Sequence, residues 1–343
     1  MLDYRLMITA IYSASMSSMV YPVCSQISLP FSDNKVAGMA FDGQPLDLYL
    51  DSGQSGTYVI YKEFYEKTYG RCPPKTCYTC IKKCHPYSHK LEMEFGVIIG
   101  WSPSPKFPTE RPLNYLGLEY HRVASGENIM IQLFLKKIIS EKRVSICVSS
   151  DAKTFTGEVI LGAFKEKQCP TTSPKIVLPV KSSGYFDTAL LSLGLVSPKG
   201  KSSIKHLPDG IAVYDTGTYC IVLPEPYFEF VLNTITQIVK QASGLDVRVE
   251  IKDGLWYIEQ RGYDYLPRLA FVVGDPENHR TIYIPPRHYT KDCDGTWCIL
   301  LLLQHNFAEI LLGRPVFTTY FSSFVENKEG QRTATLATYN RGE

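Results

Sequence analysis

Two short stretches of the chain are copies of one pattern. Residues 48–54 read LYLDSGQ and residues 212–218 read AVYDTGT, so each apolar run leads into an aspartate, a hydroxyl residue and a glycine. The aspartates are Asp51 and Asp215. One Asp-Thr-Gly tripeptide would be a weak signal, but a second copy in a matched context indicates an internal repeat. The repeat predicts two related lobes.

A strand-like run that ends in glycine follows each copy further along the chain. For the second copy this run is ILLG at 310–313. The first copy has two candidates, VIIG at 97–100 and NYLG at 114–117. The same order of segments, given twice, strengthens the prediction of two halves built alike.

The residue types in the two copies suit one kind of chemistry. Two carboxylates held face to face can share one proton, because both cannot readily ionise about 3 Å apart. One carboxylate then acts as a base toward a water molecule while the other acts as an acid. A glycine lets the backbone approach the carboxylate closely, and a neighbouring hydroxyl can donate to it. Asp51 and Asp215 are therefore candidate catalytic residues.

Composition limits the classes of function. The 343 residues suffice for two domains, and the chain is 44% hydrophobic and 20% charged, as in ordinary globular proteins. The net charge of +2 gives no basic field for nucleic acid. No apolar run long enough for a membrane span occurs after the first 20 or so residues.

Short apolar segments separated by turn residues predict an all-β fold with few helices. Two segments have helical spacing of apolar residues, 129–139 and 224–242. The expected strands cover residues 36–41, 46–50, 96–99, 144–148, 158–161, 175–180, 211–214, 270–273 and 281–284.

Ten cysteines indicate an oxidising compartment. Residues 1–22 are a possible signal peptide, with Arg5 before a largely apolar stretch. The cluster of Cys72, Cys77, Cys80 and Cys84 is compatible with two local disulfides or with a zinc knuckle. Disulfides are the favoured interpretation, and we expect no metal. Cys293 and Cys298 flank a short turn and predict a further disulfide, whereas Cys220 is expected to be structural.

The segments VAGMAFDGQPLDLYLDSGQSGTYVI at 36–60 and GIAVYDTGTYCIVLPEPYFEFVL at 210–232 resemble the two active-site loops of pepsin-like aspartic proteases. LNYLGLEY at 113–120 resembles the strand beneath the first loop. It is preferred to 97–100, because the helix and hairpin that the family has next follow it. The resemblance covers roughly residues 36–337 and implies a bilobal all-β fold, with an N-terminal lobe over 30–174 and a C-terminal lobe over 175–339.

The resemblance also assigns roles. It implies that Asp51 and Asp215 are the catalytic pair and that the loops are supported by Ser52, Gly53, Thr216, Gly217 and Thr218. The first loop departs from the family at Gln54, where Ser is usual, although Ser55 follows directly.

The two halves differ in length. Asp51 and Gly117 are 66 positions apart, whereas Asp215 and Gly313 are 98 apart. In the family this interval of the first lobe contains the flap, a hairpin that carries a tyrosine and closes over the substrate. Tyr69 and Tyr87 are weak candidates for that tyrosine. The sequence is therefore that of a divergent member, or it lacks a segment.

These observations predict an aspartic endopeptidase that acts on peptides or proteins at acidic pH without a cofactor. The alternative is a weak or inactive pepsin-like protein that binds peptides or proteins. The resemblance implies sensitivity to pepstatin-like inhibitors, a monomer without a membrane span or nucleic-acid partner, and secretion or residence in an acidic lysosome-like or vacuole-like compartment.

Overall fold

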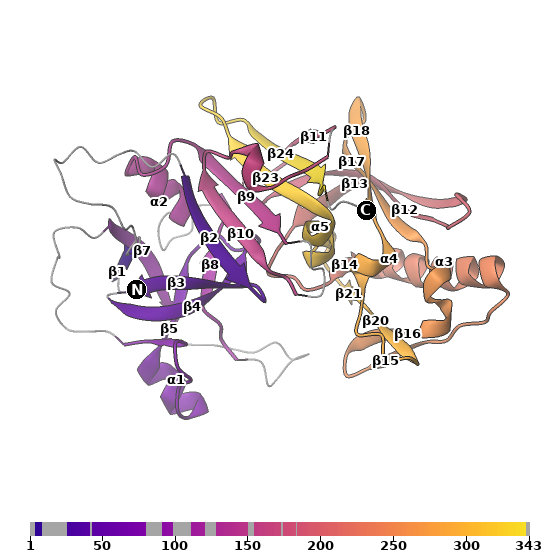
Figure 1. The fold of residues 1–343 in the computed structure, drawn as a ribbon, viewed down its shortest axis with the longest axis horizontal. Coiled ribbons are helices and arrows are strands. Elements are labelled where there is room, and N and C mark those ends of the chain that lie inside the picture. The colour runs from indigo at the N-terminus through magenta and orange to yellow at the C-terminus, as the bar shows by residue number, and fades with distance from the viewer. Residues whose placement is uncertain are drawn as a thin grey trace. The chain divides into compact units, whose positions relative to one another are not determined.

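The structure is a computed structural model in which the strands greatly outnumber the helices (Figure 1). It describes residues 4–8, 26–41, 43–79, 91–98, 111–120, 128–149, 154–172, 174–182 and 184–340. Most of the possible signal peptide lies outside these residues, as do Cys24, Cys80, Cys84 and Tyr87. The all-β prediction is confirmed.

The chain divides into two compact units. Unit 1 comprises residues 1–144 and 156–164, and unit 2 comprises residues 145–155 and 165–343. All nine segments predicted as strands lie in or overlap strands of the structure.

In unit 1 the hydrogen-bonded strand order is β1-β7-β5-β8-β4-β3-β2-β10, and β6 pairs with β5. Strand β4 shows why such segments form a half-buried sheet, because Leu46, Leu48 and Leu50 alternate with more exposed residues. The elements of this unit are β1 (Tyr4–Ile8), β2 (Gln26–Ser32), β3 (Lys35–Phe41), β4 (Gln44–Asp51), β5 (Tyr58–Tyr61), α1 (Lys62–Tyr69), β6 (Cys77–Tyr78), β7 (Leu91–Ile98), β8 (Tyr115–Gly117), α2 (Ile129–Leu135) and β10 (Gly157–Gly162).

The predicted helix at 129–139 is shorter in the structure. Asn128 caps α2, since its side chain accepts a hydrogen bond of 2.8 Å from the backbone N–H of Ile131. The helix ends at Leu135 because Lys137 has a φ of 58°, a left-handed conformation that a helix cannot include.

In unit 2 a seven-stranded sheet has the order β18-β17-β12-β13-β22-β14-β21, and a four-stranded sheet has the order β15-β16-β20-β19. A further run of paired strands is β9-β23-β24-β11. The strands are β9 (Lys142–Val148), β11 (Ile176–Pro179), β12 (Asp187–Val196), β13 (Ser202–Tyr214), β14 (Ile221–Pro224), β15 (Val249–Lys252), β16 (Leu255–Glu259), β17 (Arg268–Asp275), β18 (Asn278–Ile284), β19 (Thr290–Lys291), β20 (Trp297–Leu300), β21 (Leu302–His305), β22 (Ile310–Leu312), β23 (Tyr320–Glu326) and β24 (Arg332–Thr338).

The predicted helix at 224–242 is confirmed as α3 (Glu225–Ser243). A proline stands in its first turn, and Gly244 ends it with a φ of 78°. Its buried face carries Phe228, Val231 and Ile235, at the spacing that an amphipathic helix requires. The other helical segments of unit 2 are η1 (Glu166–Gln168), η2 (Gln260–Tyr265), α4 (Pro286–Tyr289) and α5 (Arg314–Thr319). No helix in the described residues is long and apolar enough to cross a membrane.

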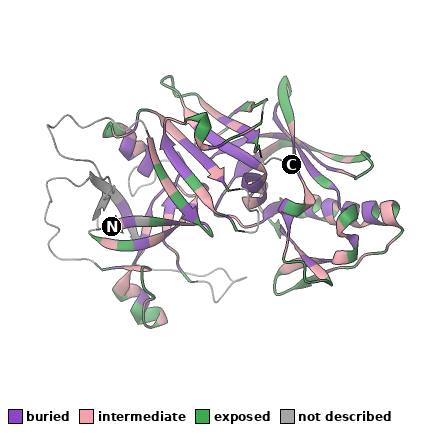
Figure 2. Ribbon diagram, viewed as in Figure 1, coloured by how far each residue is buried: buried purple, intermediate pink, exposed green. Residues whose placement is uncertain are grey.

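Both units contain buried strand segments (Figure 2), and aromatic rings pack in the core of each. In unit 1 the ring of Phe95 lies edge-on to Phe41 and Tyr78, at centroid distances of 5.1 and 5.5 Å. In unit 2 Phe186 stacks on Phe324 at 4.2 Å. Separate cores mean that each unit positions its own copy of the repeat.

The described cysteines form three disulfides. Cys293–Cys298 confirms the pairing predicted from spacing, Cys72–Cys77 is one local disulfide of the predicted cluster, and Cys147–Cys169 joins β9 to the end of η1. Because Cys72 and Cys77 are bonded to each other, they are not available as thiolate ligands in a four-cysteine zinc knuckle.

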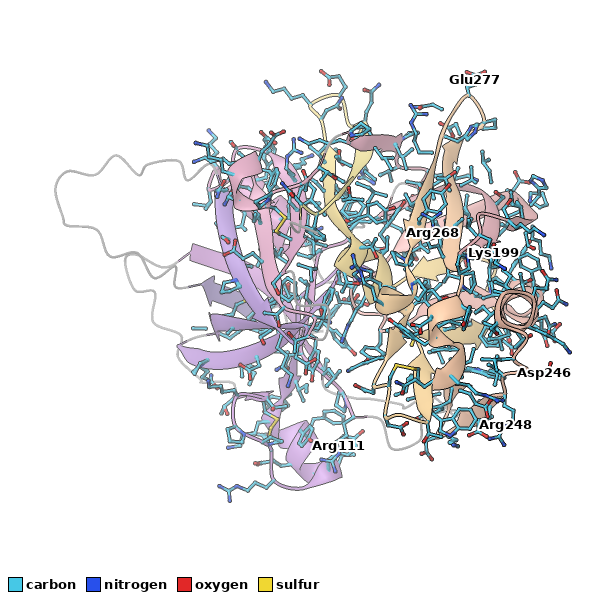
Figure 3. The ribbon with its side chains drawn as sticks, turned by 45° about the vertical axis from the view of Figure 1, so that its right-hand side comes forward. Arg111, Lys199, Asp246, Arg248, Arg268 and Glu277 are labelled. Atoms are coloured by element: carbon cyan, nitrogen blue, oxygen red, sulfur yellow. A yellow bond between two sulfur atoms is a disulfide. The ribbon has the colours of Figure 1, made fainter. Side chains whose placement is uncertain are left out.

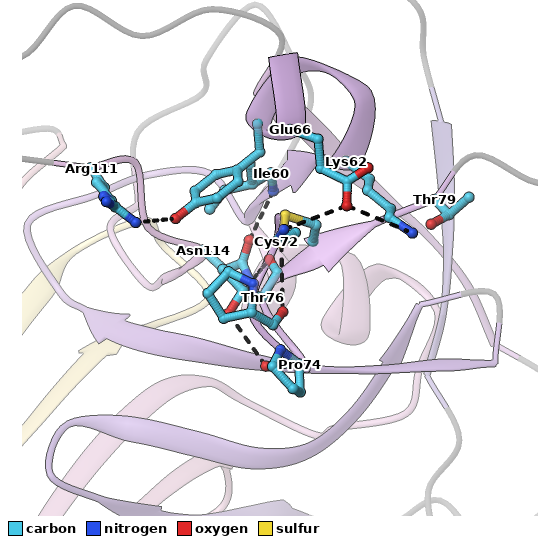
Figure 4. The surroundings of a disulfide bond; sticks show 12 residues. Ile60, Lys62, Glu66, Cys72, Pro74, Thr76, Thr79, Arg111 and Asn114 are labelled. Atoms are coloured by element: carbon cyan, nitrogen blue, oxygen red, sulfur yellow. Dashed lines mark hydrogen bonds and ion pairs between the residues drawn. A yellow bond between two sulfur atoms is a disulfide. The ribbon is translucent and has the colours of Figure 1, made fainter. Parts of the chain in front are cut away.

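The loop closed by Cys72–Cys77 is tied to the strands around it by Asn114 (Figure 4). This buried side chain accepts a hydrogen bond from the N–H of Ile60 at 2.8 Å, and it donates to the carbonyls of Thr76 at 2.8 Å and Asp47 at 3.1 Å. One amide therefore links β4, β5 and the disulfide loop just before β8 begins.

An ion cluster holds the four-stranded sheet to the loop before it. Glu259 is buried at the end of β16 and accepts hydrogen bonds from the side chains of Arg248 at 2.8 Å and Arg261 at 2.7 Å. These hydrogen bonds, that of Arg248 foremost, lower the pKa of Glu259 to about 2. Figure 3 labels Arg248 on this unit and, elsewhere on it, the exposed Glu277 between β17 and β18.

We predict that Glu259→Gln lowers the free energy of unfolding by about 1–3 kcal/mol at pH 7, because it removes a carboxylate from two guanidinium groups. The pKa of Glu259 in the folded protein lies below the usual value for glutamate, so its ionic contribution is complete above about pH 4.3. The contribution is lost as the pH falls through about 2. Chemical denaturation of wild type and variant between pH 7 and pH 2 measures the difference. Glu277→Gln is the matched control, and a difference that stays constant down to pH 2 would contradict the prediction.

Candidate active site

In unit 1 the first aspartate stands at the end of a buried parallel strand pair. Strand β4 pairs with β8 in the register Leu50 to Leu116 and Asp51 to Gly117. This register confirms residues 114–117 as the partner segment predicted for the first loop. The alternative segment begins in β7, which pairs with β5 instead.

In unit 2 the second aspartate has the same setting. Strand β13 pairs with β22 in parallel, with Tyr214 opposite Leu312, and the N–H of Asp215 donates to the carbonyl of Leu312 at 3.3 Å. In both copies the residue before the aspartate thus faces the residue before the glycine.

The copies also agree in the order of their strands. The order β7-β5-β8-β4 in unit 1 matches β21-β14-β22-β13 in unit 2. Each aspartate loop leads into a strand and then a helix, β5 and α1 in one copy and β14 and α3 in the other. The repeat in the sequence is therefore a repeat of a whole four-stranded arrangement.

The two strand-ending glycines fit against the loops so closely that no side chain could replace their hydrogen. A Cβ on Gly117 would lie 2.5 Å from the carbonyl oxygen of Gln54 and 2.3 Å from that of Gly56. A Cβ on Gly313 would lie 2.5 Å from the carbonyl oxygen of Thr218 and 2.1 Å from that of Cys220. In both copies these carbonyls belong to the third and fifth residues after the aspartate, so the same close contact shapes both loops.

The carboxylates receive hydrogen bonds from their own loops. The backbone N–H of Gly53 donates to Asp51 Oδ1 at 3.0 Å, and that of Gly217 donates to Asp215 Oδ1 at 2.8 Å. The hydroxyl of Thr218 donates to the other oxygen of Asp215. Bonds of this kind fix the orientation of a carboxylate.

The hydroxyl residues next to the aspartates, Ser52 and Thr216, are both fully buried, and Ser55 is buried as well. Gln54 is half-buried, and its carbonyl accepts a hydrogen bond from the N–H of Glu119 at 3.1 Å. The two loops belong to different units, so the pairing of Asp51 with Asp215 stays a prediction.

The sequence profile of one protein family matches this chain over residues 114–336. The family is described as eukaryotic aspartyl protease. The chain belongs to the eukaryotic aspartyl protease family. The matched residues include Asp215 and Gly313, whereas Asp51 precedes them. A search of curated proteins found no match.

In this aspartyl protease, unit 1 is much shorter than unit 2 between the strand after the aspartate loop and the strand that pairs with it in parallel. Between β14 and β21, unit 2 contains α3, α4, η2 and six strands, including the β17–β18 hairpin. In the described residues between β5 and β7, unit 1 has α1 and the two-residue strand β6. Tyr69 ends α1, with its ring 5.2 Å from Tyr65, and therefore does not stand in a hairpin. Tyr87 lies outside the described residues.

Cys220 lies between the second aspartate loop and β14, directly before the first residue of that strand. It is a buried free thiol. Burial raises its pKa to about 12, although the charge of Arg314 acts in the opposite direction. A thiol that stays protonated is a poor nucleophile, in agreement with the structural role expected for it. Within the described residues, no group of three His, Cys, Asp or Glu side chains is placed to hold a metal ion.

Sequence reasoning did not single out Arg314, the first residue of α5. Its N–H donates to the carbonyl of Thr218 at 2.9 Å, and its guanidinium lies beside the second aspartate loop. The sequence feature that could have indicated Arg314 is its position directly after Gly313, the glycine of the predicted partner strand.

We predict that Gly313→Ala lowers the free energy of unfolding by about 3 kcal/mol or more, because the new methyl group must displace backbone carbonyls. Gly330→Ala is the control, since that glycine has a φ of 80° but open space around it. The control should cost only about 1–2 kcal/mol. Denaturant unfolding of both variants provides the comparison, and equal losses would show that the close contact does not constrain the loop.

Proposed function

We propose that this member of the eukaryotic aspartyl protease family hydrolyses peptide bonds at acidic pH, with Asp51 and Asp215 as its catalytic pair. The observation that carries the proposal is the agreement between the two loops. Each has a carboxylate at the end of a parallel strand pair, with one oxygen held by the N–H two residues later. Two loops built alike would present their carboxylates in the same way to one substrate.

In the proposed reaction, the pair shares one proton and binds a water molecule between its carboxylates. The unprotonated carboxylate accepts a proton from the water as its oxygen attacks the scissile carbonyl carbon. The protonated carboxylate donates its proton to the carbonyl oxygen, which gives a tetrahedral diol. The carboxylate that took the proton from water then donates it to the leaving nitrogen, and a diol hydroxyl returns a proton to the other carboxylate. The C–N bond breaks, and the products are a carboxylic acid and an amine.

The residues around each carboxylate would keep the pair in place during these transfers. Gly53 and Gly217 supply backbone donors, and Thr218 supplies a hydroxyl. Ser52 and Thr216 are placed next to the carboxylates with buried side chains, as the family's supporting hydroxyls would be. In this proposal the lobes follow the boundaries predicted from sequence, 30–174 and 175–339, and the substrate is an extended peptide bound without a cofactor.

The three disulfides agree with folding in an oxidising compartment. We therefore place the proposed protease in the secretory pathway, either secreted or in an acidic lysosome-like or vacuole-like organelle. We propose that it acts as a monomer and binds pepstatin-like inhibitors.

A second candidate function is peptide or protein binding with little or no turnover. The observation that favours it is the short interval between β5 and β7 in the described part of unit 1, where the family has its flap. A lid excludes water and completes an active site, so its loss would reduce turnover more than binding.

We predict that the purified chain cleaves denatured haemoglobin at acidic pH and that pepstatin inhibits the cleavage. Asp215→Asn and Asp51→Asn should each lower kcat by about 1000-fold or more, because neither amide can take part in the proton transfers. The rate of peptide release measures the effect, with thermal unfolding as the check that the variants fold. Asp209→Asn is the matched control, because Asp209 is an exposed aspartate in the same unit as Asp215.

A wild-type chain that binds immobilised pepstatin but releases no peptides would instead support the binding function. Unchanged cleavage in either aspartate variant would refute the assignment of the catalytic pair.

A further inference from the structure

Arg314 contacts the second aspartate loop through both its backbone and its side chain. Its N–H donates to the carbonyl of Thr218 at 2.9 Å. Its guanidinium Nε donates to the carbonyl of Thr216 at 3.5 Å, a long hydrogen bond in which the attraction of the charge for the carbonyl dipole matters most. One residue thus holds two carbonyls of the loop Asp215-Thr216-Gly217-Thr218.

The carbonyl of Thr216 belongs to the same peptide group as the N–H of Gly217, and that N–H donates to Asp215 Oδ1 at 2.8 Å. In a planar trans peptide the C=O and N–H bonds point in opposite directions. A cation that holds this carbonyl therefore aims the N–H at the carboxylate. It also polarises the peptide group, which strengthens the bond to the carboxylate.

Thr218 is held in a similar way. Its carbonyl accepts the N–H of Arg314, while its hydroxyl donates to the second oxygen of Asp215. The Gly217 N–H and the Thr218 hydroxyl both donate to the Asp215 carboxylate. Arg314 forms a hydrogen bond to the peptide group of the first and to the carbonyl of the same residue as the second.

The guanidinium itself lies close to two aromatic rings of unit 2. Its Cζ lies 5.3 Å from the ring centre of Phe155 and 5.0 Å from that of Tyr219. The ammonium of Lys291 also lies 5.2 Å from the centre of the Tyr219 ring. Phe155, Arg314, Tyr219 and Lys291 form a cation–π ladder beside the loop, and such stacking restrains a planar guanidinium better than an ammonium.

In the first copy, Leu118 is the residue that follows the strand-ending glycine. Its N–H donates to the carbonyl of Asp51 at 3.1 Å, and the carbonyl of Gln54, which corresponds to that of Thr218, accepts the N–H of Glu119 at 3.1 Å instead. A leucine side chain cannot donate to a carbonyl. The guanidinium is therefore a feature of the second copy, and the sequence of the first copy supplies a natural replacement for testing it.

We propose that Arg314 is a positioning residue that fixes the Thr216–Gly217 peptide group and, through it, the carboxylate of Asp215. Its effect on the carboxylate is a property of unit 2 alone, whereas its effect on catalysis rests on the proposed function. The two are tested by different measurements.

The first measurement is the NMR signal of the Gly217 amide in protein labelled with 15N-glycine. In the wild type we expect a downfield amide proton, as for a donor to a carboxylate, whose shift changes when acid protonates Asp215. In Arg314→Leu the signal should move upfield, and its change with pH should fall by at least half. Arg268→Gln is the matched control, because Arg268 also stacks on a ring, that of Tyr283 at 4.9 Å.

The second measurement is steady-state cleavage of a peptide substrate. We expect Arg314→Leu to lower kcat by about 10- to 100-fold with little change in KM, since it misplaces a catalytic group without removing substrate contacts. Arg314→Lys keeps a cation near the rings and should recover part of the loss. Arg314→Gln replaces the leucine variant if the latter does not fold.

A Gly217 signal in Arg314→Leu with the wild-type shift and pH response would overturn the proposal. If the wild type cleaves, an Arg314→Leu variant with the wild-type kcat would overturn it as well. If the wild type does not cleave but the Gly217 signal shifts as expected, the positioning role stands and the proposed function fails.

Discussion

The structure depends most on a contact that tolerates no side chain. Gly117 and Gly313 each end a strand against two carbonyl oxygens of an aspartate loop, at distances where a Cβ would collide with the backbone. Because the strand comes so close, the loop must leave the sheet in one direction, and its aspartate must remain at the end of the neighbouring strand. Backbone geometry thus places each aspartate at the end of its strand, and hydrogen bonds from the loop then orient its carboxylate.

The rest of each unit supports this contact. Parallel pairing of β4 with β8, and of β13 with β22, brings the glycine beside the loop. Asn114 ties β4, β5 and the disulfide loop together next to the start of β8. In unit 2 the ring of Phe324, which stacks on Phe186, packs against Tyr214 at a centroid distance of 5.6 Å. The core is thus arranged directly behind the residue that precedes Asp215.

Much of this could be predicted from the sequence, because the decisive signals are local. An apolar run that leads into Asp-Ser-Gly or Asp-Thr-Gly is visible in a single segment, and its recurrence at 212–218 indicated the two halves. The helix at 224–242 had an amphipathic pattern with proline at its start, and the structure ends it at the glycine that follows. Cys293 and Cys298 stand close enough along the chain to indicate their own pairing.

Other features could not be predicted because they depend on contacts between distant segments. The end of α2 at Leu135 follows from a left-handed Lys137 that apolar spacing does not reveal. Cys147 pairs with Cys169 only because the fold brings β9 beside the end of η1. Arg314 reaches Phe155, 159 positions earlier in the chain, and no local pattern connects them.

The buried thiol of Cys220 has a consequence for how the protein acquires its disulfides. Disulfide exchange requires a thiolate, and a thiol with a pKa of about 12 supplies almost none at neutral pH. Before β14 joins its sheet, however, the same cysteine is an ordinary reactive partner for the others. Burial in the finished sheet therefore withholds Cys220 from exchange with the disulfides that have already formed.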